Sequence, residues 1–126
     1  MSIAPGTYDV LPPFTPVAAF GPHRAADFWK LPQGELVELI KGRLVMSPSP
    51  RPTHQLISAA LTEWIMGVAR KSGGFAVAAP ADVALADHTI LQPDLLYITK
   101  ERRSIVKHCI EGPPDLVIEI LSDSAV

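Results

Sequence analysis

Two carboxylates stand in apolar segments of this sequence, and they are the residues best suited to chemistry. Asp94 follows Pro93 and heads the apolar run LLYI, while Glu119 interrupts the run LVIEIL at residues 116–121. Removing a lone carboxylate from water is costly, so each acid is expected to be protonated, paired with a cation or bound to a metal. The alternatives are an edge strand that leaves Glu119 in water and a turn or strand-cap role for Asp94.

The pair predicts a magnesium site. Two acids at the ends of adjacent strands, together with a backbone carbonyl such as that of Ile120, offer the hard oxygen ligands that Mg²⁺ prefers, and Mn²⁺ can take its place. Such a metal could activate water for attack on a phosphodiester. Glu38 is a third candidate acid. His54 could contact phosphate or the metal's water, with a capping or surface role as its alternative.

The pattern around these residues predicts one long helix and several short strands. Apolar residues recur at three- and four-residue spacing from His54 to Val68, Thr53 is a candidate cap, and Gly73-Gly74 ends the helix. A hairpin is expected at residues 35–40 and 43–46, around Lys41-Gly42. Further strands are expected at residues 75–79, 82–85, 90–99 and 115–121, and short helices at 23–30 and 100–108. This combination predicts an α/β or α+β fold.

The chain of 126 residues is the size of one domain. Five of its 13 prolines fall within residues 1–22, which predicts a proline-rich extended arm. Residues 23–126 are then the folded domain. We expect this domain to be incomplete at the C-terminus, because the chain stops directly after an apolar strand.

Composition narrows the range of partners. A net charge of −2 gives no global attraction to nucleic acid, so DNA contact must be local. The candidate patches, each of which could also be an ordinary solvated face, are Lys100, Arg102, Arg103 and Lys107, and the pair Arg70 and Lys71. One cysteine and no CxxC spacing exclude an intrachain disulfide and argue against zinc. With no signal peptide and no membrane span apparent, a cytoplasmic protein is expected.

Three stretches carry a family resemblance: ELIKGRLVMSPSPRPTHQ, DVALADHTILQPDLLYI and IEGPPDLVIEILS. Together they resemble the Uma-two family of restriction endonucleases, in the PD-(D/E)xK nuclease superfamily, over about residues 28–124. The resemblance implies a restriction-endonuclease-like core with a mixed, largely antiparallel sheet. It also implies that Asp94 is the aspartate of the PD motif and Glu119 the acid of ExK. Glu38 matches the N-terminal acid, and His54 a position that is commonly polar.

The sequence departs from this pattern at the lysine. The ExK motif would place lysine at position 121, where this chain has Leu121, and no lysine follows before the chain ends. Our first hypothesis is a Mg²⁺-dependent DNA endonuclease, with catalytic activity left open. The alternatives are an inactive truncated family member that serves as a fold remnant or a homodimer covering its last strand, and a DNA-binding module without cleavage.

Overall fold

The computed structural model describes residues 2–4 and 8–121, with side chains for residues 8–121. It divides into two compact units. The first comprises Met1–Ser49 and Ala84–Leu91, and the second Pro50–Val83 and Gln92–Val126. Residues 54, 94, 119 and 120, four of the five predicted site positions, fall in the second unit, and Glu38 falls in the first.

The first unit is built on the predicted hairpin. Strands β3 (Val37–Ile40) and β4 (Arg43–Met46) pair antiparallel in the register Val37↔Met46. Lys41 and Gly42 form the turn with φ angles of 48° and 79°, which is the left-handed region that glycine enters without steric cost. On its other side β3 pairs with β7 (Thr89–Leu91), which is followed in the sheet by β6 (Val83–Ala86).

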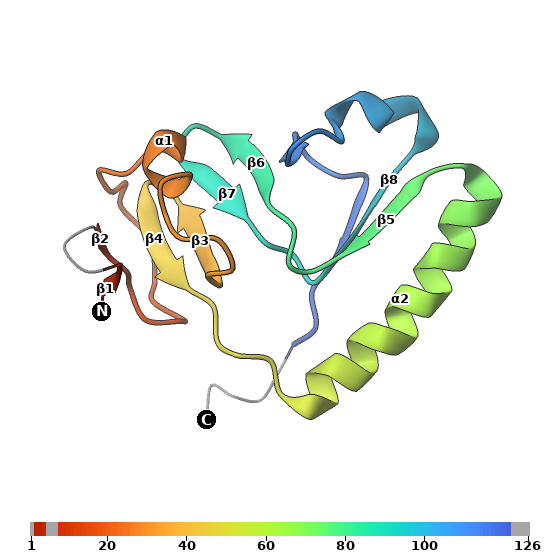
Figure 1. Ribbon diagram of the computed structural model, residues 1–126, viewed down its shortest axis with the longest axis horizontal. Helices are drawn as coiled ribbons and strands as arrows, with labels where there is room; N and C mark the ends of the chain where they lie inside the picture. The colour runs from red at the N-terminus through yellow and green to blue at the C-terminus, as the bar shows by residue number, and fades with distance from the viewer. Residues whose placement is uncertain (1, 5–7, 122–126) are drawn as a thin grey trace. The chain divides into compact units, whose positions relative to one another are not determined.

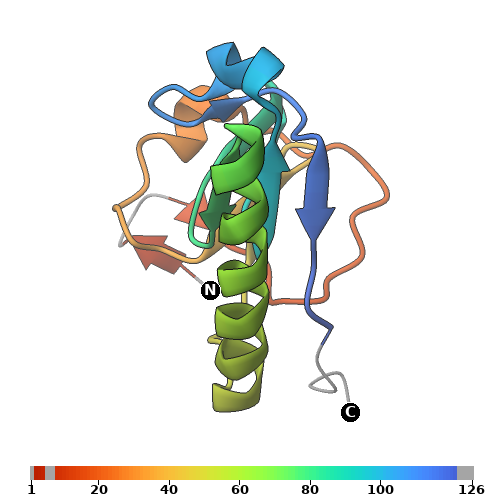
Figure 2. The same ribbon diagram turned by 90° about the vertical axis from the view of Figure 1, so that its right-hand side faces the viewer.

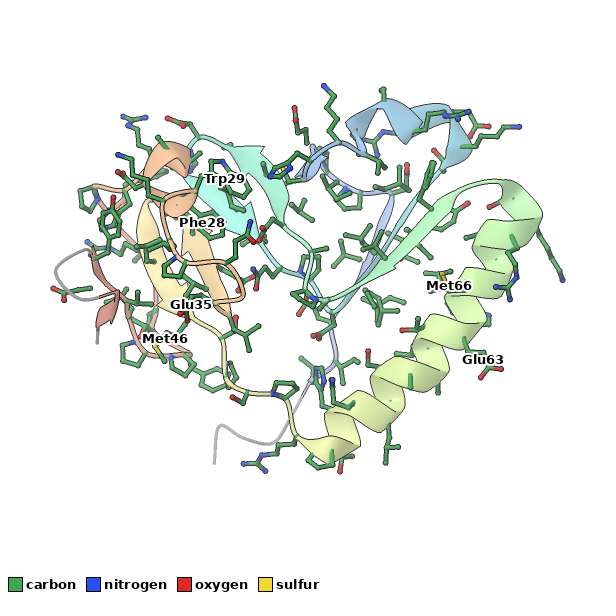
Figure 3. The ribbon with its side chains drawn as sticks, in the orientation of Figure 1. Phe28, Trp29, Glu35, Met46, Glu63 and Met66 are labelled. Carbon is green, nitrogen blue, oxygen red and sulfur yellow. The ribbon has the colours of Figure 1, made fainter. Side chains whose placement is uncertain are left out.

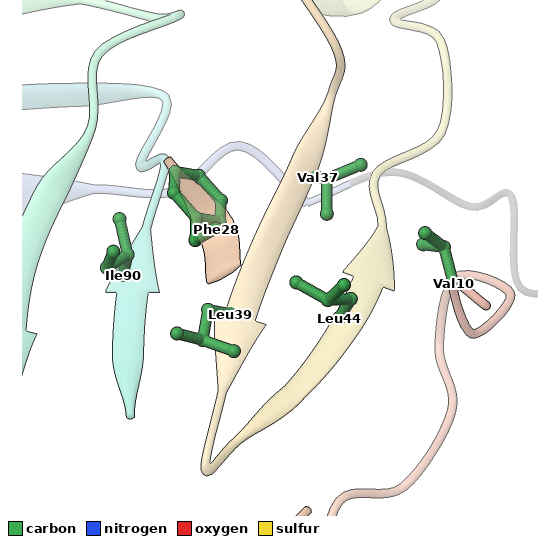
Figure 4. Packing of buried hydrophobic residues seen from close by; sticks show 6 residues of the cluster. All are labelled: Val10, Phe28, Val37, Leu39, Leu44 and Ile90. Carbon is green, nitrogen blue, oxygen red and sulfur yellow. The ribbon is translucent and has the colours of Figure 1, made fainter. Parts of the chain in front are cut away.

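The predicted arm contains short regular elements and supplies a core residue. Strands β1 (Ser2–Ala4) and β2 (Tyr8–Asp9) pair with each other, and Leu11 bridges to Val45. The short helix expected at residues 23–30 is α1, which is shorter (Ala25–Phe28). Val10 is only 1% exposed. Figure 4 shows it in the cluster of Val10, Phe28, Val37, Leu39, Leu44 and Ile90.

The second unit places one long helix on a three-stranded sheet. Helix α2 (Pro52–Ser72) leads into β5 (Phe75–Ala78), and the sheet order is β10 (Leu116–Ile118), β8 (Leu95–Ile98), β5, with antiparallel pairing throughout. Figure 1 shows α2 and β5 joined by a tight connection. A 3₁₀ helix (Lys100–Ile105) and strand β9 (Ile110–Glu111) complete the unit. The predicted α/β fold class is confirmed.

Helix α2 begins at a proline, which restricts the backbone, and ends at a glycine, which can adopt a positive φ. Arg51 is the N-cap and Pro52 occupies the first turn, so the expected Thr53 cap is wrong. Proline is favoured there because its missing N–H would be unpaired in any case. At the other end Gly73 adopts φ 78° and closes the helix as predicted.

The two faces of the three-stranded sheet are covered differently. Helix α2 packs on β5 and β8, with Ile65 and Ala69 buried and Glu63 pointing away from the sheet in Figure 3. On the other face lies a second cluster of buried apolar residues, which comprises Val83, Leu96, Ile98 and Ile110. Helix α2 contacts chiefly β5 and β8, and in Figure 2, which looks onto the helix, β10 is not covered by it.

Two strand predictions need correction. The single strand expected at residues 90–99 is two strands, β7 and β8, because Gln92, Pro93 and Asp94 break it; proline lacks the N–H that a continuous ladder needs. The strand expected at residues 115–121 is β10, which ends earlier, at Ile118, and lies at the edge of its sheet. Leu116 and Val117 are 43% and 44% exposed because β10 has one neighbouring strand and α2 contacts chiefly β5 and β8.

No helix in the described part of the chain is long and apolar enough to cross a membrane.

Candidate active site

Asp94 stands immediately before β8, at a point where three segments meet. The pairings of β8 with β5 and with β10, each continued by one residue, bring Ala79 and Glu119 opposite Asp94. The backbone bears this out on one side, because the N–H of Ala79 donates to the carbonyl oxygen of Asp94 at 2.9 Å. Asp94 therefore occupies a fixed position at the end of the sheet.

Glu119 and Ile120 contact Asp94 from the other side. The N–H of Asp94 donates to Oε1 of Glu119 at 3.3 Å, and the N–H of Ile120 donates to Oδ2 of Asp94 at 2.7 Å. These reciprocal bonds tie the segment after β10 to the start of β8. The two acids are thus neighbours, although Glu119 lies beyond the end of its strand and is exposed.

The first turn of α2 adds an imidazole to this group. Nε2 of His54 lies 3.2 Å from Oδ1 of Asp94, and its Nδ1 lies 3.0 Å from Oε1 of Gln55. The side chains of His54 and Asp94 are only 18% and 19% exposed. Each carboxylate oxygen of Asp94 therefore has its own nitrogen partner, one from α2 and one from the segment after β10.

These residues lie in the part of the chain that a family model matches. The model is described as "Putative restriction endonuclease" and covers residues 25–126. The chain belongs to the Uma2 family. The resemblance found in the sequence is thereby confirmed.

A solved structure supports the same assignment. The crystal structure of a "putative nuclease belonging to DUF820" from Anabaena variabilis ATCC 29413 superposes with a TM-score of 0.67 at 26% sequence identity. The match covers 80% of this chain but only 59% of the length of that protein. No curated protein matches the chain.

The acids at this point of the Uma2 chain have the chemistry of an open site for a divalent metal. Within the described residues, no three His, Cys, Asp or Glu side chains are grouped to hold a metal ion. Mg²⁺, however, commonly uses one or two protein carboxylates and completes its octahedron with water and substrate phosphate. Asp94 and Glu119 are two carboxylates joined through the Asp94 N–H, so their number and oxygen chemistry fit such an open site.

The remaining site predictions concern Glu38 and the missing lysine. Glu38 lies on β3 of the first unit, half-buried and opposite Val45. Leu121 is 92% exposed, so the side chain at the ExK lysine position projects into solvent. Lys100 lies six residues after Asp94, beyond the far end of β8, about 20 Å away at the rise of a strand. It cannot replace the lysine at this site.

The predicted basic patch is partly neutralised. Arg102 pairs with Asp115 at 3.2 Å, and Lys107 pairs with Glu111 at 3.6 Å. The backbone N–H of Thr99 and the guanidinium of Arg102 lower the pKa of Asp115 below its usual value. Asp115, which was expected only to start a strand, therefore anchors the loop before β10 to Thr99 and Arg102. An acid next to a Gly-Pro-Pro break was the available signal for a loop anchor.

Proposed function

We propose that this chain carries the metal-binding core of a DNA endonuclease that hydrolyses phosphodiester bonds with Mg²⁺ or Mn²⁺. Membership of the Uma2 family and the fold support a nuclease. The observation that carries the finer proposal is the contact between the Asp94 and Glu119–Ile120 segments, which places two carboxylates side by side at the end of a sheet.

In this proposal Asp94 and Glu119 hold the metal, and the carbonyl oxygen of Ile120 is a further ligand. The bound metal supplies a polarised phosphoryl oxygen and a water of lowered pKa. The protein supplies the fixed position of the two carboxylates, which their hydrogen bonds to backbone N–H groups maintain.

DNA contact in this proposal comes from local positive charge. Because Arg102 and Lys107 are paired with acids, the contribution of the predicted patches falls mainly to Lys100, Arg103, Arg70 and Lys71. Binding through phosphates weakens steeply as salt rises, because each contact releases condensed counterions.

Leu121 favours a second candidate function, a metal-binding chain that does not cleave DNA. In PD-(D/E)xK sites the lysine orients the attacking water and offsets charge that develops on the phosphate. Here an exposed leucine takes that position. In this alternative the family's metal site is retained and its catalysis is lost.

Plasmid cleavage tests the proposed activity. Supercoiled plasmid is incubated with the wild-type chain, Asp94→Ala or Glu119→Ala, in Mg²⁺, in Mn²⁺ and in EDTA. We expect nicking that needs the metal and falls about 100-fold or more in both variants, since metal stabilisation of the transition state is worth several kcal/mol. Absence of cleavage by folded wild-type chain that binds the metal would favour the second candidate, and cleavage that persists in EDTA would exclude the proposal.

A further inference from the structure

His54 has both ring nitrogens engaged within the protein. Nε2 lies against Oδ1 of Asp94 and Nδ1 against Oε1 of Gln55, at 3.2 and 3.0 Å. We propose that His54 is a positioning residue, which fixes the Asp94 carboxylate for metal binding and is itself held by Gln55. This inference rests on the proposed function, because it takes Asp94 as a metal ligand.

An aspartate carboxylate that is held by a single hydrogen bond can still rotate. Rotation about the Cβ–Cγ bond of aspartate is soft, so one hydrogen bond leaves its second oxygen poorly placed. In this structure the Ile120 N–H holds Oδ2 and His54 holds Oδ1. The two partners come from different elements, α2 and the segment after β10. Together they fix the plane of the carboxylate and hence the lone pairs that would face a metal.

Gln55 completes this arrangement by restricting the ring. Imidazole must keep a hydrogen on Nε2 to donate to Asp94, and its Nδ1 then needs a partner. The amide of Gln55 can either accept a hydrogen bond from Nδ1 or, after rotation by 180°, donate one to it. It can therefore hold the ring in either protonation state, and the inference does not depend on that state.

The same contacts argue against a phosphate-binding role for His54. A histidine that binds phosphate needs a ring nitrogen open to the ligand, whereas both nitrogens here face protein oxygens and the side chain is only 18% exposed. A positioning role predicts weaker metal binding on substitution. A phosphate-contact role predicts weaker DNA binding with metal affinity retained.

Calorimetric titration with Mn²⁺ alone separates these roles. The variants are His54→Ala, His54→Gln and Gln55→Ala, with His88→Ala as a matched histidine control, since His88 lies in the other unit and contacts Thr89 and Phe20. Outer partners of metal ligands typically contribute 10- to 100-fold in affinity. We expect Mn²⁺ affinity to fall about 10- to 100-fold in His54→Ala. In Gln55→Ala it should fall about 10-fold, at the lower end of that range, because Gln55 is exposed. His88→Ala should match the wild type.

The variant His54→Gln separates hydrogen bonding from packing. Its amide nitrogen reaches about as far as Nε2 and can donate to Asp94, so we expect it to recover most of the lost affinity. Thermal melting without metal establishes that each variant is folded. If His54→Ala does not fold, Gln55→Ala still tests the proposal. Unchanged Mn²⁺ affinity in folded His54→Ala, or no recovery in His54→Gln, would overturn the positioning role. Folded wild-type protein that binds no Mn²⁺ would instead overturn the proposed metal site itself.

Discussion

Leu121 lies where the proposed PD-(D/E)xK site would have a lysine. It follows Glu119 by two positions, as the ExK lysine would, and its side chain is 92% exposed. A lysine there would replace an exposed leucine, so it would leave no buried cavity and bury no charge. This position therefore allows catalysis to be tested separately from folding.

We predict that Leu121→Lys increases metal-dependent plasmid cleavage. The introduced ammonium group would lie near the acids and offset charge on the phosphate, an electrostatic contribution of about 10-fold or more. The rate of nicking in Mg²⁺ is the measurement. Val117→Lys, on the same segment but before Glu119, is the control that adds the same charge. An equal gain in both variants would mean that added charge acts through general DNA affinity.

The sequence predicted that Asp94 and Glu119 lie close together, because Asp94 heads one apolar run and Glu119 interrupts another, and the hydrogen bond between the two residues agrees with this. It did not reveal how Asp94 is held. The contact with His54 depends on where α2 begins relative to β8, and the sequence placed that start at Thr53. The sequence also provided no reason to expect that Gln55 holds the His54 ring, because neighbouring residues of a helix do not ordinarily face each other.

At the scale of elements, α2 sets the position of His54, and its C-terminal cap is open to a direct test. Gly73 closes the helix with φ 78°, and a Cβ there would lie 3.1 Å from Lys100 Cδ. We predict that Gly73→Ala lowers the free energy of unfolding by about 1 kcal/mol, because alanine is strained at positive φ. Urea denaturation monitored by circular dichroism measures the change.

Gly67 provides the matched control within the same helix. It lies in the helix interior, and a Cβ there would meet nothing within 4 Å. Gly67→Ala should therefore raise stability by about 0.5–1 kcal/mol, because alanine is the better helix former. The same sign of change in both variants would contradict the capping role of Gly73.

The contacts of Asp115 before β10 should make the stability of the protein depend on pH. Its carboxylate accepts the Thr99 N–H at 2.8 Å and pairs with Arg102, and these contacts lower its pKa from the ordinary value of 3.8. A lowered pKa in the folded state stabilises the protein above pH 3.8, and this contribution disappears as the pH falls through the lowered value.

Asp115→Asn should therefore destabilise the protein at pH 7, with a difference from wild type that shrinks in strong acid. Urea midpoints measured at pH 7 and below pH 3.8 provide the comparison. Glu63→Gln, at an exposed position on α2, controls for loss of one negative charge. A difference that stays constant across this pH range would show that Asp115 acts through something other than its charge.

The sequence predicted most of these elements but misjudged their edges. The hairpin at Lys41-Gly42 and the end of α2 at Gly73 follow from local turn chemistry, which short segments encode well. The burial of β10 does not follow from local sequence, because an apolar strand has the same sequence whether a neighbouring strand or solvent lies beside it. Pairing between distant segments decides that question.

At the scale of the whole molecule, a substantial apolar surface is exposed in the second unit. Leu56 and Trp64 on α2 are 73% and 57% exposed, and Leu116 and Val117 on β10 are 43% and 44% exposed. Edge strands and large apolar patches promote association between chains.

We predict that Leu56→Glu combined with Val117→Lys reduces concentration-dependent association. Because both positions are exposed, the free energy of unfolding should change by no more than about 0.5 kcal/mol for each. Light scattering over a concentration series measures association, and urea denaturation checks the fold. Glu63→Lys, which alters charge on α2 outside the apolar residues, is the control. Equal scattering by wild type and the double variant would contradict this prediction.

The proposed function depends on Asp94 and Glu119 forming one metal site, and equilibrium metal binding tests this most directly. Isothermal calorimetry with Mg²⁺ and Mn²⁺ is applied to the wild type, Asp94→Ala and Glu119→Ala, each shown to be folded by circular dichroism. We predict one metal per chain for the wild type and loss of that binding in both variants. Metal affinity that is unchanged in either folded variant would contradict a metal site formed by these two acids.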